Sequence, residues 1–266
     1  MLGLTLFIFV FGLIWGSFLN VVIYRTTHGA SPLSGRSKCP KCKRTISWKY
    51  NIPLISFFWL RGKCAYCRAK ISWQYPVVEL LTGLLFVWWL WIGRGFFLLV
   101  GQPWTLLQPV FWLVTGMLLV VVFVADWRFG LIPDSANFSL FVLALGYRLS
   151  LTGFGLMQAT DLVRAIICGL VLMAFFYGLW FFTRGRGFGF GDVKLAPSLG
   201  LLLGWPKTVV AVFLAFVLGA VVAVVLIALG NKKLGQTIPF GPFLVLGTFV
   251  ALLFGGRLCG LYWGLL

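Results

Sequence analysis

The sequence predicts an all-α polytopic membrane protein of about eight transmembrane helices that carries one small soluble module. Hydrophobic residues make up 61% of the 266 residues and charged residues only 10%, whereas a soluble domain averages roughly 45–50% and 25%. The apolar residues are gathered in long runs, and the one long polar stretch, 25–75, holds the only clustered cysteines. A water-soluble fold would expose far too much apolar surface, so the bilayer is the predicted solvent for most of the chain.

Eight apolar segments define the predicted membrane helices. Most of them are long enough to cross roughly 30 Å of hydrocarbon at about 1.5 Å per residue. The segments are 2–23, 76–93, 105–125, 136–152, 162–182, 193–205, 207–229 and 238–264. The segment 193–205 is short and contains Pro197, so it is expected to be either a short tilted crossing or a re-entrant element.

The positive charge of the chain predicts its orientation. The chain has 22 Lys and Arg against 5 Asp and Glu, a net charge of +17. The stretch 25–70 alone contains 11 of the basic residues and is therefore predicted to be cytoplasmic. Eight crossings, with both termini outside, place 17 Lys and Arg on the cytoplasmic side and 5 on the other. This distribution indicates membrane topology and contact with anionic lipid, and it argues against nucleic-acid binding.

The four clustered cysteines predict a metal site in the soluble stretch. That stretch divides the chain into a first transmembrane helix, 1–24, a cytoplasmic module, 25–75, and a multi-helix membrane core, 76–266. Two CxxC pairs separated by 21 residues are typical of a tetrahedral zinc site, and a metal can stabilise a loop that is too small for its own core. We predict a zinc-ribbon-like module with structural zinc, the alternative being reduced cysteines without metal. The predicted ligands are Cys39, Cys42, Cys64 and Cys67.

Few residues in this sequence could carry catalysis. The single histidine, His28, has no recognisable nucleophile motif beside it, and the absence of HExxH excludes a zincin-type site. Only five carboxylates occur, namely Glu79, Asp126, Asp134, Asp161 and Asp192. Asp134 and Asp161 stand where helices begin, and both are expected to act as N-caps. The other three lie at or inside the ends of apolar segments, where an ionised carboxylate is costly and is usually functional.

Asp126 and Asp192 form the strongest candidate pair. Asp126 ends the apolar run VVVFVADW, Asp192 follows the alternating glycines of 185–191, and the eight-helix topology puts both on the cytoplasmic side. Two facing carboxylates would share a proton, so that the ionised one can activate water while the protonated one donates a hydrogen bond to a scissile carbonyl. The alternative is two separate helix caps, or salt bridges with Arg128 and Lys194. The glycines would let backbone or substrate approach closely, or would simply form a flexible basic loop.

At these residues the sequence resembles the type IV prepilin peptidases (prepilin leader peptidase/N-methyltransferases). The resemblance runs nearly end to end, through six motifs in order. The matching stretches are 16–25 (GSFLNVVIYR), the two CxxC pairs, 75–82 (YPVVELLT), Asp126 with 131–134 (LIPD), 189–195 (GFGDVKL) and 238–243 (IPFGPF).

The resemblance implies an intramembrane aspartic endopeptidase of the GxGD type, a group that also includes the presenilin-like proteases, with Asp126 and Asp192 as its catalytic pair. Such enzymes remove the leader from type IV prepilins or type II secretion pseudopilins, at the cytoplasmic face of the bacterial inner membrane. The resemblance also implies N-methylation of the new N-terminus with S-adenosylmethionine, although no Rossmann-like loop is present to place that cofactor. Arg128 departs from the family pattern, which often has an acidic residue there, and it would favour an ionised Asp126.

Substrate contacts are hypothesised for Glu79, Lys194, Gly189 and Gly191. Glu79 could meet a positive group of the leader, or it could form a structural ion pair with Lys70 or Arg68. Lys194 could contact the aspartates or an acidic group of the substrate, or it could simply snorkel toward the membrane surface. Two other functions stay open from the residues alone: an ion- or proton-coupled small membrane transporter that uses the same aspartates, and a scaffolding subunit.

Overall fold

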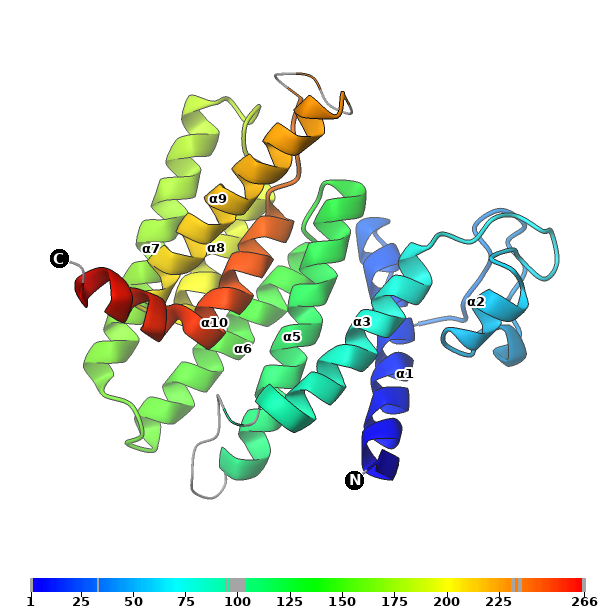
Figure 1. The fold of residues 1–266 in the computed structure, drawn as a ribbon, viewed down its shortest axis with the longest axis horizontal. Coiled ribbons are helices and arrows are strands. Elements are labelled where there is room, and N and C mark those ends of the chain that lie inside the picture. Colours follow the sequence, from blue (N-terminus) through cyan, green and yellow to red (C-terminus); the bar gives the residue numbers. More distant parts are fainter. Residues whose placement is uncertain are drawn as a thin grey trace. The chain divides into compact units, whose positions relative to one another are not determined.

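Helices account for nearly all of the regular structure in this protein, which is described by a computed structural model (Figure 1). The structure describes residues 2–32, 34–93, 95, 104–230, 233 and 236–264. Within these residues, six helices are long and apolar enough to cross a membrane. This confirms the predicted all-α polytopic membrane protein. The chain divides into two compact units, Met1–Val121 and Val122–Leu266.

Each of the eight predicted apolar segments coincides with a helix. These are α1 (Leu2–Thr27), α3 (Gln74–Trp88), α5 (Trp104–Phe129), α6 (Asp134–Gly153), α7 (Ala159–Phe182), α8 (Phe190–Leu203), α9 (Lys207–Ala228) and α10 (Gly241–Gly264). A π-helical turn, η2 (Trp89–Gly93), extends α3. The six candidate spans do not include α6 or α8. With 14 residues, α8 is roughly 21 Å long, which is less than the ~30 Å of a hydrocarbon core.

In the first unit, α1 packs along α3 through small residues. A Cβ atom at Gly16 would lie 2.6 Å from Cα of Glu79, and one at Gly12 would lie 2.8 Å from Cα of Gly83. The two helices therefore touch at positions where only glycine fits, a packing mode that suits membrane helices because it brings the backbones close together. Between these helices the chain forms the cysteine module, with a 3₁₀ turn, η1 (Trp48–Tyr50), and a short helix, α2 (Ile55–Trp59).

In the second unit, α8 is the central helix. It packs against α6 and α7 and also contacts α9 and α10, and ten of its 14 residues are buried. A Cβ atom at Gly200 would lie only 2.3 Å from Cα of Gly169, so α7 and α8 meet at a pair of glycines. A helix covered in this way can hold a polar residue at its start away from bulk water.

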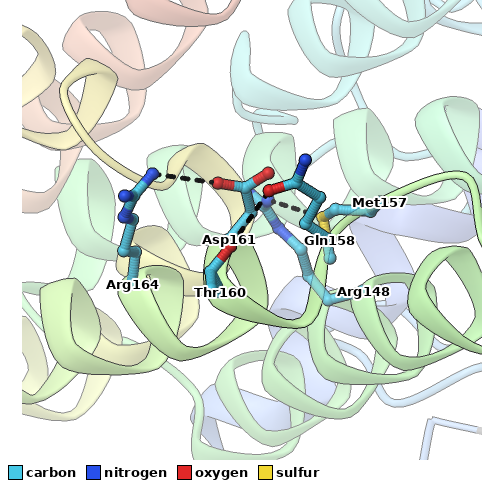
Figure 2. Close-up of polar contacts among 6 residues, drawn as sticks. All are labelled: Arg148, Met157, Gln158, Thr160, Asp161 and Arg164. Atoms are coloured by element: carbon cyan, nitrogen blue, oxygen red, sulfur yellow. Dashed lines mark hydrogen bonds and ion pairs between the residues drawn. The ribbon is translucent and has the colours of Figure 1, made fainter.

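Arg148, from α6, holds the C-terminal end of α8. Its Nε donates to the carbonyl of Leu201 at 2.8 Å and its Nη2 donates to that of Leu202 at 3.3 Å. Figure 2 shows the same side chain reaching Met157, whose sulfur lies 3.3 Å from Nη1. The last carbonyls of a helix lack partners within the helix and carry partial negative charge, so the guanidinium both satisfies and neutralises them. This cap allows α8 to end among buried residues.

Neither Asp161 nor Asp134 acts as the N-cap that the sequence predicted. The N-cap of α7 is Gln158, and Asp161 lies inside the first turn, where its Oδ1 is 3.3 Å from Nη1 of Arg164 (Figure 2). Asp134 is the first residue of α6, after Pro133 as N-cap, and the cap makes no side-chain hydrogen bond. The extended backbone of Gln158 and Pro133 starts each helix earlier than expected. Both aspartates still place negative charge in the first turn, which the helix dipole favours.

Candidate active site

Asp126 lies near the C-terminal end of α5 and is buried, with 6% of its surface exposed. Its Oδ2 accepts a hydrogen bond from the backbone N–H of Gly241, the first residue of α10, at 2.8 Å. A Cβ atom at Gly241 would lie 2.7 Å from that same oxygen. Only glycine therefore allows the start of α10 to come this close to the carboxylate.

Asp192 is the third residue of α8 and is 3% exposed. Its Oδ2 accepts a hydrogen bond from the backbone N–H of Gly189, the N-cap residue, at 3.3 Å. The neighbouring Gly191 packs against Ile132, because a Cβ atom there would lie 3.2 Å from Cβ of Ile132. The GxGD segment is thus fixed by a carboxylate on one side and an apolar contact on the other.

The two carboxylates lie near enough for the charge of Asp126 to act on Asp192. Asp192 lies in the first turn of α8, and the carboxylate of Asp126 meets the first N–H of α10, so both carboxylates face helix starts, where the dipole favours negative charge. In both cases the hydrogen bonds found among the described residues use only Oδ2, which leaves Oδ1 for water or substrate. Two like charges in a buried site cannot both ionise cheaply, so the pair can hold one shared proton.

The alternatives to a dyad are only partly realised. Both carboxylates accept hydrogen bonds from backbone N–H groups at helix starts, and the charge of Asp126 also acts on Asp192, so capping does not exclude a pair. Neither carboxylate forms a salt bridge with Arg128 or Lys194 among the described residues. In the part of the chain that the structure describes, the ion pairs are Arg164–Asp161 and Lys194–Asp134, and Arg128 is exposed.

A cluster of four phenylalanines joins the two segments whose backbone N–H groups bind the carboxylates. Phe188 precedes Gly189, Phe240 precedes Gly241, and their rings meet edge to face with centroids 5.2 Å apart. Phe216 of α9 lies 4.9 Å from Phe240, and Phe176 of α7 lies 6.1 Å from Phe188. The sequence reasoning missed this cluster, although both phenylalanines stand directly before glycines of its motifs.

Lys194 and the two glycines with hypothesised substrate contacts lie around Asp192. The Nζ of Lys194 is 2.8 Å from Oδ1 of Asp134, and both side chains are substantially exposed. Gly189 donates its N–H to Asp192, and Gly191 contacts Ile132. All three residues therefore lie in the segment that positions Asp192, and Lys194 has Asp134 as its ion-pair partner.

Glu79 belongs to the first unit, where it is buried in α3 with 7% of its surface exposed. Its Oε2 accepts a hydrogen bond from the backbone N–H of Leu54 at 2.8 Å. Leu54 has a φ of +58°, a left-handed conformation that is costly for a branched residue. The carboxylate thus satisfies a strained turn at the start of α2, and it forms no ion pair with Lys70 or Arg68.

The two CxxC pairs have the same backbone geometry. In each pair, the backbone carbonyl of the first cysteine accepts a hydrogen bond from the N–H of the residue four positions later. The N–H of the same cysteine donates to the carbonyl of the residue five positions later, and all of these bonds are 2.8–3.0 Å long. The residue after the second cysteine, Lys43 or Arg68, has a φ of +58° in both. An isolated β-bridge closes each pair, Lys38 with Thr45 and Lys63 with Lys70. Such repeated knuckles turn both thiols of a pair toward one point.

The four thiols gather closely enough to bind one metal ion. All four Sγ atoms lie within 4.8 Å of one another, and those of Cys39 and Cys67 are 3.8 Å apart. Tetrahedral zinc with Zn–S bonds of about 2.3 Å requires sulfurs roughly 3.8 Å apart, so the cluster fits that ion. The backbone N–H of Cys67 lowers the pKa of the Cys64 thiol to about 7, which favours a thiolate there. The pKa of the Cys67 thiol, although lowered by the backbone N–H of Ala69, is raised overall to about 11 by burial and the neighbouring thiols, so metal binding would displace a proton from it.

Comparisons with known proteins agree with this arrangement. Residues 10–92 match the bacterial peptidase A24 N-terminal domain and residues 112–224 match the type IV leader peptidase family. The first match contains the four cysteines and the second contains both aspartates. No solved structure was found to match the chain.

Curated relatives match the chain over most of its length. The prepilin leader peptidase/N-methyltransferase of Aeromonas hydrophila is 34% identical over 96% of this chain and 92% of the relative. Those of Stutzerimonas stutzeri and Pseudomonas aeruginosa are 34% and 32% identical, each over 98% of this chain and 94% of the relative. These matches do not favour the transporter that the sequence alone left open. The chain belongs to the type IV leader peptidase family.

Proposed function

We propose that this protein is a membrane-embedded aspartic endopeptidase that removes the leader peptide from type IV prepilins or type II secretion pseudopilins. Asp126 and Asp192 are its catalytic pair, and they act at the cytoplasmic face of the bacterial inner membrane. The observation that carries the proposal is that two buried carboxylates, each bound through Oδ2 by a backbone N–H, lie near enough for the charge of one to act on the other. Membership of the leader peptidase family and the prepilin peptidase names of its relatives support the choice of substrate.

The geometry supports a general acid–base mechanism. The ionised carboxylate takes a proton from a water molecule, whose oxygen attacks the scissile carbonyl, while the protonated carboxylate donates a hydrogen bond to the carbonyl oxygen. The tetrahedral intermediate then collapses as a proton passes to the leaving amine. The peptide bond is replaced by a carboxyl group on the leader and an amine on the mature protein. Because each Oδ2 is held by the backbone, little reorganisation is needed at the moment of reaction.

Purified protein and a prepilin in detergent provide the test. We expect Asp126→Asn and Asp192→Asn each to lower turnover by about 10³-fold or more, since general acid–base groups typically contribute about 10²–10⁴-fold. Loss of the leader is measured by mass spectrometry. Asp161→Asn is the matched control, because Asp161 is an exposed aspartate paired with Arg164 at the start of α7. Cleavage that survives in both variants of the pair would rule out the dyad.

We further propose structural zinc in the cysteine module and N-methylation of the new N-terminus with S-adenosylmethionine. Four thiolate ligands would leave no open position on the zinc, so its role is to stabilise the module. The methylation proposal rests on the names of the relatives, which include an N-methyltransferase activity. Cleaved pilin incubated with the enzyme and S-adenosylmethionine should gain the mass of one methyl group, and a product of unchanged mass would contradict the proposal.

The substrate contacts of Glu79, Lys194, Gly189 and Gly191 stay proposals. The hydrogen bond between Glu79 and the Leu54 N–H favours a structural role for that carboxylate. Glu79→Gln separates the two roles, because glutamine keeps an oxygen for Leu54 and loses the charge. If Glu79 binds the leader, the variant should raise KM for a basic leader and leave KM for a neutralised leader unchanged. If the basic and the neutralised leader have equal KM values, in the wild type as well as in the variant, Glu79 does not contact a positive group of the leader.

A further inference from the structure

The short helix α2 presents an apolar face that the described residues of the first unit leave mostly exposed. Ile55, Phe58 and Trp59 are spaced i, i+3 and i+4, so they share one side of the helix. Their exposed fractions are 60%, 62% and 69%. A single exposed apolar side chain is ordinary, but three large ones on one face of a helix indicate a surface that is not in contact with bulk water.

Two contacts tie α2 to the beginning of α3. The N–H of Leu54, the residue that precedes α2, donates to Glu79 at 2.8 Å. The rings of Phe57 and Phe58 lie 4.9 Å and 6.5 Å from that of Trp73. Trp73 directly precedes α3, which begins one of the candidate membrane spans. The position of α2 is therefore set by the end of a membrane helix.

The packing of α1 against α3 indicates how deep in the membrane the contact between Leu54 and Glu79 lies. Glu79 touches Gly16, which precedes Arg25 by nine residues, or roughly 13 Å along a helix. The Nδ2 of Asn20 donates to the carbonyl of Tyr75 at 3.0 Å, which fixes the same register. Glu79 is thus level with the apolar run of α1, on the membrane side of the first basic residue. Because the N–H of Leu54 is bonded to Glu79, the start of α2 lies on the same side of Arg25, within reach of the acyl chains.

The charge of the surrounding module fits the same surface. The first acidic residue of the chain is Glu79, and 11 Lys and Arg lie between Arg25 and Lys70. A tetrathiolate zinc site would offset only part of this positive charge. Basic residues beside an apolar helical face are typical of elements that bind anionic lipid surfaces, with aromatic side chains at the headgroup level.

We propose that α2 is an interfacial anchor: Ile55, Phe58 and Trp59 insert into the membrane surface, and the basic residues of the module bind anionic headgroups. The inference is independent of the catalytic pair. It assigns the module a second task, which is to lie on the bilayer and not to extend freely into the aqueous phase.

Fluorine NMR of the full-length protein tests this proposal. The protein is labelled with 5-fluorotryptophan and placed in nanodiscs of phosphatidylcholine, with or without phosphatidylglycerol. Trp59→Phe identifies the Trp59 resonance by its loss. We expect doxyl-labelled lipid to broaden this resonance several-fold more than a water-soluble gadolinium chelate does, and we expect the difference to grow with phosphatidylglycerol.

A second variant tests whether the apolar face of α2 is responsible for the lipid contact of Trp59. Ile55→Ser combined with Phe58→Ser should reverse the two broadening effects at Trp59, while the zinc content shows that the module stays folded. The proposal is overturned if wild-type Trp59 is broadened by the chelate and spared by the lipid label in both bilayers. It is also overturned if protection from the chelate appears only after a prepilin is added, because the face would then bind protein. Equal broadening by the lipid label in both bilayers would contradict the part of the proposal in which basic residues bind anionic headgroups.

Discussion

The cysteine module and the aspartate pair hold their functional groups in opposite ways. The module takes its four thiols from two short pairs, each closed by its own turn, and repeats one local geometry twice. The aspartate pair takes its carboxylates from α5 and α8 and its backbone donors from Gly189 and Gly241, so that segments more than a hundred residues apart in the chain must meet. A metal can gather ligands that are already arranged locally. A carboxylate pair has no such ligand-gathering ion, and the packing of the helices must place it.

This comparison ranks the expected effects of mutation. After replacement of the aspartates themselves, substitutions that move one of their backbone donors should damage activity most. Loss of a thiol should damage the module more than the chemistry. Changes in the packing around the donors should have smaller effects, and changes to exposed charges should have the smallest.

After replacement of the aspartates themselves, the largest effect is expected for Gly241→Ala. The added methyl group would lie 2.7 Å from Oδ2 of Asp126, so either the carboxylate or the start of α10 must move. A displacement of about 1 Å can cost about 10²-fold in turnover, and we expect a loss of at least this size in prepilin cleavage. Gly256→Ala is the matched control, because it adds the same methyl group to the same helix with nothing within 4 Å. Equal turnover of the two variants would show that Asp126 does not depend on this contact.

Cys64→Ser should act on the module first. Metal binding contributes on the order of 10 kcal/mol to the folding of small zinc modules, so loss of one ligand should release zinc and expose 25–75 to trypsin. The measurements are zinc per protein, by atomic emission, and the rate of tryptic cleavage. Cys168→Ser, in α7 and outside the cluster, is the control and should change neither. Full zinc retention by Cys64→Ser would contradict the four-thiol site.

Phe240→Leu should have an intermediate effect. The change keeps an apolar side chain and removes ring contacts with Phe188 and Phe216. Aromatic pairs contribute about 0.5–1.5 kcal/mol each beyond the area they bury, so we expect a lower melting temperature and a loss of turnover of about tenfold or less. Phe213→Leu, on α9 and 66% exposed, should change neither quantity. A cluster that only stabilises the fold would lower the melting temperature and leave the turnover of the folded fraction intact.

Sequence reasoning captured the local features of this molecule well. Long apolar runs report a membrane helix directly, because the bilayer requires them, and all eight segments are helices. The CxxC spacing predicted the thiol cluster for a similar reason, since each pair is formed by its own turn. Asp126 and Asp192 stood out because a carboxylate in an apolar context is costly and therefore rarely accidental.

Features that depend on contacts between distant parts of the chain could not be predicted from the sequence. The N–H of Gly241 holds Asp126 across 115 positions of sequence, and no local pattern records such a contact. The hydrogen bond between Glu79 and Leu54, and the capping of α8 by Arg148, depend in the same way on which helices become neighbours. The predicted cap at Asp161 failed for a different reason: a helix can start at an extended residue such as Gln158 without a side-chain hydrogen bond.

The smallest effect is expected for Lys194→Met, which tests how far the catalytic site extends. Lys194 lies two residues from Asp192, but its ammonium group pairs with the exposed Asp134. Exposed ion pairs contribute about 0–1 kcal/mol, so turnover and stability should change little. Asp134→Asn removes the same pair from the other side, and the double variant completes a cycle. If the pair is all that matters, the three variants should have the same kcat and KM. A kcat for Lys194→Met well below that of Asp134→Asn would instead place the lysine in contact with the substrate or the aspartates, and the site would then include a residue at the exposed edge of the aspartate pair.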